Sequence, residues 1–106
     1  MSGFDNEICN ANGYRGARRS IASSDSITRD DFYIGCNHNV AITLDLPTNP
    51  GESQMFIIKD ESGSASSYPI TIQVSGGAID GQSSFIINVD YGAINLMSNG
   101  LEYYIF

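Results

Sequence analysis

The stretch that decides the fold reads Val40-Ala41-Ile42-Thr43-Leu44-Asp45-Leu46. A large apolar side chain stands at every second position, and a small or polar side chain stands between each pair. Because successive side chains of a strand point to opposite faces, this alternation predicts a β-strand with one buried face. Pro47 and the turn Asn49-Pro50-Gly51 end the strand. The stretch therefore indicates a β protein.

Other short segments of the chain have strand patterns of the same kind. Residues 70–74 and 85–89 alternate, and residues 55–58 form an unbroken apolar run, which is typical of a strand buried on both faces. Turn residues separate these segments, including a tight hairpin at Asn99-Gly100. No window has the period of an amphipathic helix. About seven or eight strands at roughly ten-residue spacing predict an all-β fold, a small antiparallel β-sandwich or jelly-roll-like domain.

Residues 1–20 differ in character from the rest of the chain. Glycine and asparagine are frequent there, and the apolar residues follow neither a helical nor a strand period. We therefore divide the chain into an extended N-terminal arm, residues 1–20, and a β domain, residues 21–106. Arg15, Arg18 and Arg19 are candidate docking residues, because guanidinium groups pair with carboxylates and carbonyls. A solvated, flexible tail is the alternative interpretation.

The charge distribution excludes several kinds of partner. The formal net charge is −7, and residues 31–106 carry all of it, with Lys59 against eight acidic residues. Such a body repels a phosphate backbone, so we expect no nucleic-acid binding. No apolar run approaches the ~20 residues that span a membrane, and no secretory signal precedes the domain. We therefore expect neither a membrane partner nor export by the usual route.

The length and the cysteine content favour association between copies. A chain of 106 residues forms one domain that buries a modest fraction of its surface, so oligomerisation is the expected support. Cys9 and Cys36 are the only cysteines, too few for a disulfide framework. One bridge between them is an open alternative, although two free, buried thiols fit the composition better.

Patterns that carry chemistry are weak in this sequence. His38, the only histidine, stands two residues from Cys36, but no third group that would orient a catalytic pair is evident. Cys9, Cys36 and His38 lack the chelating C-x-x-C pair of a zinc site. Four turn acids offer oxygens to calcium without forming a calcium loop: Asp60, Glu61, Asp80 and Asp90. We therefore expect no enzyme, no metal and no cofactor. A small hydrolase that uses His38 or Asp80 is the minor alternative.

The second half of the chain resembles a known family in its order of short motifs. The motifs are Phe56-Ile-Ile-Lys-Asp60-Glu-Ser-Gly63, Pro69-Ile-Thr-Ile72, Gly77-Ala-Ile-Asp-Gly81, Tyr91-Gly-Ala-Ile-Asn-Leu96, Ser98-Asn-Gly100 and Tyr103-Tyr-Ile105. This succession resembles a β-rich module of bacteriophage virion proteins, seen at tail-fibre ends and in head decoration or spike proteins. The resemblance covers about residues 40–106 and implies a virion context and a homotrimer. Tyr103 stands where the module usually has tryptophan.

Together these observations predict a bacteriophage virion structural protein, a capsid decoration (cement or spike) protein. We expect a homotrimer that docks by its arm on the major capsid protein or another virion protein at the capsid surface. Assembly in the host bacterial cytoplasm suits unpaired cysteines. The alternative is a tail-fibre or tail-tip module that binds a receptor or glycan. Its stacking residues would be tyrosines: Tyr14, Tyr33, Tyr68, Tyr91, Tyr103 and Tyr104.

Overall fold

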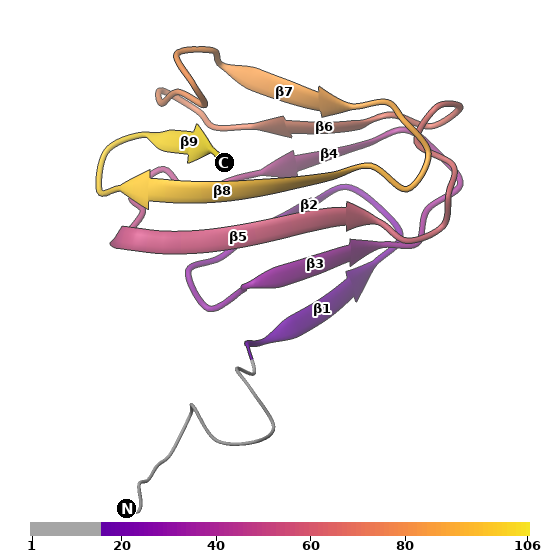
Figure 1. Cartoon of the computed structure of the whole chain (residues 1–106), viewed down its shortest axis with the longest axis horizontal. Helices are drawn as coiled ribbons and strands as arrows, with labels where there is room; N and C mark the ends of the chain where they lie inside the picture. The colour runs from indigo at the N-terminus through magenta and orange to yellow at the C-terminus, as the bar shows by residue number, and fades with distance from the viewer. Residues whose placement is uncertain (1–15) are drawn as a thin grey trace, which may run out of the picture.

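Residues 16–106 are the part of the chain that the structure, a computed structural model, describes (Figure 1). They form two β-sheets that lie as two layers, without any helix, so this range contains no helix that could cross a membrane. The predicted all-β fold is confirmed. The strands are β1 (Arg18–Ile21), β2 (Asp25–Ser26), β3 (Tyr33–Cys36), β4 (Ile42–Asp45), β5 (Glu52–Asp60), β6 (Ile70–Gln73), β7 (Ser84–Ile87), β8 (Ala93–Asn99) and β9 (Tyr103–Ile105).

The chain alternates between the two sheets for its first six strands. The larger sheet has the order β1-β3-β5-β8-β9, and the smaller sheet has the order β2-β4-β6-β7. Each of β3, β4, β5 and β6 pairs in parallel with the strand two places earlier in the chain. The chain then reverses, so β7 lies antiparallel to β6, and β8 and β9 extend the larger sheet in antiparallel fashion. The first six strands therefore wind as a coil, and the last three close it.

The predicted antiparallel arrangement is right for three strand pairs and wrong for four. β5–β8, β6–β7 and β8–β9 are antiparallel, whereas every pairing among the first six strands is parallel. Parallel neighbours need a crossover connection, and here each crossover contains a strand of the opposite sheet. Side-chain alternation records which face of a strand is buried. It carries no information on the direction of the neighbouring strand.

The core lies between the sheets and uses the inward positions of both. Ile42 and Leu44 are almost fully buried, as the alternation of residues 40–46 predicts, but Val40 is exposed because β4 begins after it. In β5 the only fully buried apolar residues are Phe56 and Ile58. Met55 and Ile57 lie on the outer face and are half-buried, so the prediction that residues 55–58 are buried on both sides is wrong. The core is therefore a single layer of side chains between two sheets.

The C-terminal hairpin closes the sandwich on one side. Gly100 has a φ of 95°, which suits glycine, and the Asn99 side-chain oxygen accepts the backbone N–H groups of Leu101 and Glu102, so the predicted tight turn is confirmed. Tyr103 is buried against Phe56, and its hydroxyl donates to the Pro47 carbonyl over 2.6 Å. Burial raises the pKa of Tyr103 to about 12. The position where the module usually has tryptophan is therefore a core position in this chain.

The sheet begins before the boundary drawn from the sequence. β1 starts at Arg18, so the last three residues of the predicted arm belong to the larger sheet. Residues 1–15, with Arg15 and Cys9, lie outside the described residues. Cys36 is buried and carries a free thiol.

Candidate docking and assembly surfaces

Arg18 is the first of the predicted docking residues that the structure describes. Its guanidinium group donates to both carboxylate oxygens of Glu61, over 2.7 and 2.8 Å, and lies 5.6 Å from the centre of the Tyr33 ring. The Tyr33 hydroxyl donates to the same carboxylate over 2.7 Å. The hydrogen bonds from Tyr33 and Asn37, followed by Arg18, lower the pKa of Glu61. Arg18 thus joins β1 to the end of β5 on the outer face of the larger sheet.

Arg19 makes its contacts on the opposite face of β1 from Arg18. Its side chain lies on the same face as Ile21, which is the core face, and donates to both oxygens of Asp31 over 3.1 and 3.0 Å. It also donates to Asp25 over 2.8 Å and to the Ser26 carbonyl over 3.0 Å. The hydrogen bond to Asp31 is the main reason why the pKa of Arg19 is raised. Arg19 therefore ties β1 of the larger sheet to β2 of the smaller one.

The structure thus brings two of the three predicted docking arginines into the sandwich. Arg18 and Arg19 have carboxylate partners within their own chain, and a capsid partner would have to replace those partners. The Arg18 side chain is still 56% exposed, whereas that of Arg19 is 36% exposed. Arg15 lies outside the described residues. The sequence gives no sign of these pairings, because the acids lie up to 43 residues away.

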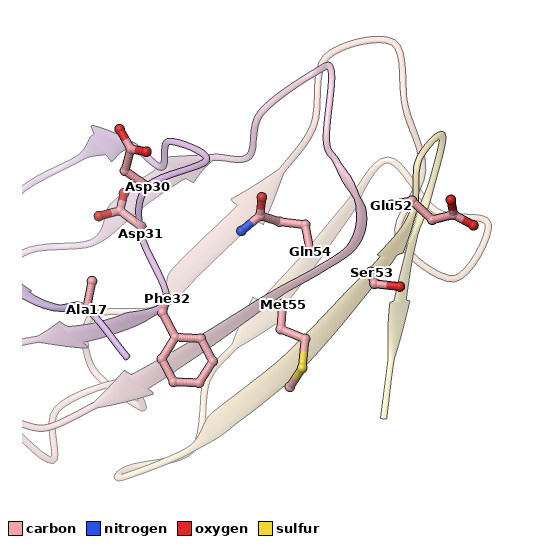
Figure 2. A pocket seen from close by; sticks show the side chains of 8 residues that line it. All are labelled: Ala17, Asp30, Asp31, Phe32, Glu52, Ser53, Gln54 and Met55. Carbon is pink, nitrogen blue, oxygen red and sulfur yellow. The ribbon is translucent and has the colours of Figure 1, made fainter. Parts of the chain in front are cut away.

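An open hollow lies where the chain enters the sandwich (Figure 2). Its volume is about 720 Å³, and it contains the acidic side chains Asp30 and Glu52 together with apolar Phe32 and Met55. Gly16 passes so close to the Phe32 ring that a Cβ atom there would stand 2.1 Å from it. The complete lining is Ala17, Asp30, Asp31, Phe32, Glu52, Ser53, Gln54 and Met55.

Asp60, the last residue of β5, forms a buried polar centre beside the loop that leads to β6. It is fully buried and accepts five hydrogen bonds, from the N–H groups of Ser62, Gly63, Ala65 and Tyr91 and from the Ser62 hydroxyl. Burial acts to raise the pKa of Asp60, but the donors, led by the Tyr91 and Ala65 N–H groups, lower it to about 2. The carboxylate is therefore charged at neutral pH, and it holds two loops together.

His38 adjoins this centre, and its ring nitrogens lie near Tyr68 and Ser62. Its Nε2 atom lies 2.7 Å from the Tyr68 carbonyl oxygen, so this nitrogen is a donor. Its Nδ1 atom lies 3.4 Å from the Ser62 hydroxyl, which itself donates to Asp60 over 2.8 Å. Burial raises the pKa of Cys36 to about 12, so the thiol is protonated at neutral pH and is a poor nucleophile. The histidine therefore supports the loop that Asp60 organises.

The turn acids weighed as calcium ligands are spread over separate contacts. Asp60 is buried, Glu61 pairs with Arg18, Asp80 accepts from the Ile105 N–H group, and Asp90 accepts from the Ser66 N–H group. Within residues 16–106, no group of three or more His, Cys, Asp or Glu side chains is arranged to hold a metal ion.

The tyrosines considered for sugar stacking fall into two groups. Tyr103 is buried, and Tyr33 is half-buried beneath Arg18. Tyr68, Tyr91 and Tyr104 are 39%, 60% and 42% exposed, and Tyr14 lies outside the described residues. Tyr91 also has the Lys59 ammonium group 5.7 Å from its ring centre.

Large apolar side chains are exposed along and beyond β7, and sequence reasoning missed them. The alternation of residues 85–89 predicts that Phe85, Ile87 and Val89 are buried, but only Ile87 is. Phe85, Ile86 and Val89 are 37%, 50% and 66% exposed, because β7 is an edge strand that ends at Ile87. The signal available in the sequence is the lack of charge around them, since Asp80 is the only charged residue from Ser62 to Val89.

Comparisons with known proteins do not assign this chain to a family. No protein-family model matches this chain, and a search of curated proteins finds no match to it.

Proposed function

We propose that this chain is a structural protein of a bacteriophage virion, a capsid decoration protein that associates with its own copies, as a homotrimer, at the capsid surface. Its partner there would be the major capsid protein or another virion protein. The virion context is supported by the succession of turn and core motifs in residues 40–106, which resembles virion β modules. The β fold on which those motifs depend is compatible with this assignment.

The observation that carries the assembly part is the exposed apolar surface of a well-packed sandwich. Among residues 16–106, nine large apolar residues are more than a third exposed, although the core between the sheets is buried. Single exposed apolar side chains are common, but a group of them on adjacent elements marks an interaction site. Phe85, Ile86 and Val89 form such a group on β7 and the turn after it. Copies that bury this group gain stability that one small domain lacks.

Docking on the capsid is assigned to the arm and Arg15 rather than to all three arginines. Arg18 and Arg19 pair with acids of their own chain and hold the first strand in place. Residues 31–106, which carry all of the chain's net charge of −7, would project from the head, soluble and repelled by nucleic acid. Several weak arm contacts, one from each copy, would add up to tight binding.

The test uses a variant that lacks residues 2–15 and keeps every described residue. We expect it to fold as the full chain does, by circular dichroism, and to lose co-sedimentation with phage heads that lack this protein. Arg18→Ala is the matched control, because it removes a charge from the same region and leaves residues 2–15 in place. It should still bind heads. Undiminished head binding by the truncated variant would contradict arm docking, and immunogold label on tails would contradict the capsid assignment.

The second candidate is a tail-fibre or tail-tip module that binds a receptor or glycan. The observation in its favour is Tyr91, which is 60% exposed and has Lys59 beside its ring. An exposed aromatic face is a stacking surface for the apolar face of a sugar. Retention on a glycan array that Tyr91→Ala abolishes would favour this function, and no retention by the wild-type chain would dismiss it.

A further inference from the structure

Each of the two sheets has two edge strands, and three of these four edges are protected. An unprotected edge offers free backbone groups to another strand, and native proteins block edges with charges, short strands or covering segments. β1 carries Arg18 and Arg19, the second of which points toward the core face. β2 has only two residues, one of them Asp25. β1 is the edge strand next to β3 in the larger sheet, and β2 is the edge strand next to β4 in the smaller sheet (Figure 1).

The third edge, β9, is covered by the chain itself. The Tyr103 N–H group donates to the Ala78 carbonyl over 2.9 Å, and the Asp80 N–H group donates to the Tyr103 carbonyl over 3.0 Å. The Asp80 carboxylate then accepts the Ile105 N–H group over 3.1 Å. The segment around Ile79 thus acts as a short added strand on β9.

β7 lacks each of these protections. Figure 1 shows it at the outer border of the smaller sheet, where β6 is its only partner strand. Within residues 16–106, its residues Ser84–Ile87 make no hydrogen bond beyond that pairing. The segment from Gly81 to Val89 contains neither proline nor a charged residue. Phe85 and Ile86 are exposed on it, and a shallow groove of about 180 Å³ is lined by residues 85–89 together with Gly92 and Ala93.

The charge distribution indicates which partner this edge fits. Residues 62–89 carry a single charge, that of Asp80, whereas the remaining residues carry sixteen of the seventeen charges of the chain. Two copies of a chain with net charge −7 repel each other wherever their acidic surfaces meet. β6 and β7 themselves contain no charged residue, so the half of the smaller sheet that they form is where two copies can approach with few acids at the contact. A cationic partner, in contrast, would be drawn to the acidic parts of the surface.

We propose that the β7 edge surface, formed by Phe85, Ile86 and Val89, is the surface through which copies of this chain associate. A β7 strand of one copy lies beside a second copy, and its exposed apolar side chains are buried there. This inference rests on the self-association in the proposed function and assigns its location. It does not depend on the capsid or on the arm.

The experiment measures the association of the full chain by sedimentation velocity over a range of concentrations. Ile86→Lys places a charge on the edge, as natural edge strands do. Leu101→Lys is the matched control, because it makes the same change at an exposed apolar residue in the β8–β9 turn. We expect Ile86→Lys to weaken association about tenfold or more and Leu101→Lys to leave it unchanged. Val89→Lys, just beyond β7, serves if Ile86→Lys does not fold.

Salt provides a second and independent readout. An uncharged contact between acidic bodies should strengthen as NaCl rises from about 50 to about 500 mM, because screening removes the repulsion between them. Association that weakens with salt would overturn the inference, since it would indicate a charge-paired contact. If the edge variants associate as the wild type does, the location is wrong while self-association stands. A wild-type chain that stays monomeric at every concentration overturns both. If wild-type chains are monomeric and Ile86→Lys abolishes binding to phage heads, the β7 edge surface would instead bind another virion protein.

Discussion

Replacement of Asp60 by asparagine keeps the side-chain size and removes the charge that five hydrogen bonds hold at the end of β5. The native environment lowers the pKa of Asp60 from 3.8 to about 2. Because one pKa unit corresponds to about 1.4 kcal/mol, the ionised carboxylate stabilises the folded state by about 2 kcal/mol. An asparagine amide group would in addition direct N–H donors toward N–H donors of the loop, at a cost of about 1 kcal/mol.

We therefore expect Asp60→Asn to lower the free energy of unfolding by about 3 kcal/mol at pH 7. For a domain of this size, the midpoint of thermal unfolding should fall by roughly 12–24 °C. Urea unfolding followed by circular dichroism is the measurement. Asp90→Asn is the control, because Asp90 lies in an exposed position and accepts one N–H group, that of Ser66. Its effect should stay below about 1 kcal/mol.

The pH dependence of the free energy of unfolding tests the same role of the Asp60 carboxylate, because acid removes its charge without a substitution. The pKa of Asp60 is lower in the folded chain than in the unfolded chain, so its contribution is fully present above about pH 4. It is lost as the pH falls from there through about 2. The Asp60→Asn variant should lack this part of the acid destabilisation. Equal stability losses in Asp60→Asn and Asp90→Asn, or identical acid slopes in Asp60→Asn and wild type, would refute the role given to the buried carboxylate.

Two further predictions concern buried side chains. Tyr103→Phe removes the donor to the Pro47 carbonyl and should lower the free energy of unfolding by about 1 kcal/mol. Tyr104→Phe is the control and should change it little, because Tyr104 is exposed. Equal effects of the two substitutions in urea unfolding would contradict a stabilising role for the Tyr103 hydrogen bond. In a Cys9→Ser variant, Cys36 should not react with a thiol reagent at pH 8 until the chain unfolds. The reason is that Cys36 is buried, which raises the pKa of its thiol to about 12. Rapid labelling of Cys36 in the folded protein would contradict this prediction.

The surfaces proposed for docking and assembly were only partly predictable from the sequence. Arg15, Arg18 and Arg19 stand out as a cluster, but the acids that bind Arg18 and Arg19 are distant in sequence or belong to other loops. The near-absence of charge from Ser62 to Val89, where Asp80 is the only charged residue, can be read directly from the sequence. The sequence does not reveal that β7, within this segment, is a free edge strand, because an edge is defined by the absence of a neighbouring strand.

The sequence by itself determined the alternating strands β4 and β6, the buried face of β4 and the Asn99-Gly100 turn, since side-chain alternation and turn chemistry are local properties. Only the tertiary structure decided that the first six strands pair in parallel and alternate between two sheets. It also decided that Met55 and Ile57 face outward and that Asp60 is buried among backbone donors. These features depend on which distant segments become neighbours, and the alternation of side chains within one strand is the same whichever neighbour that strand has.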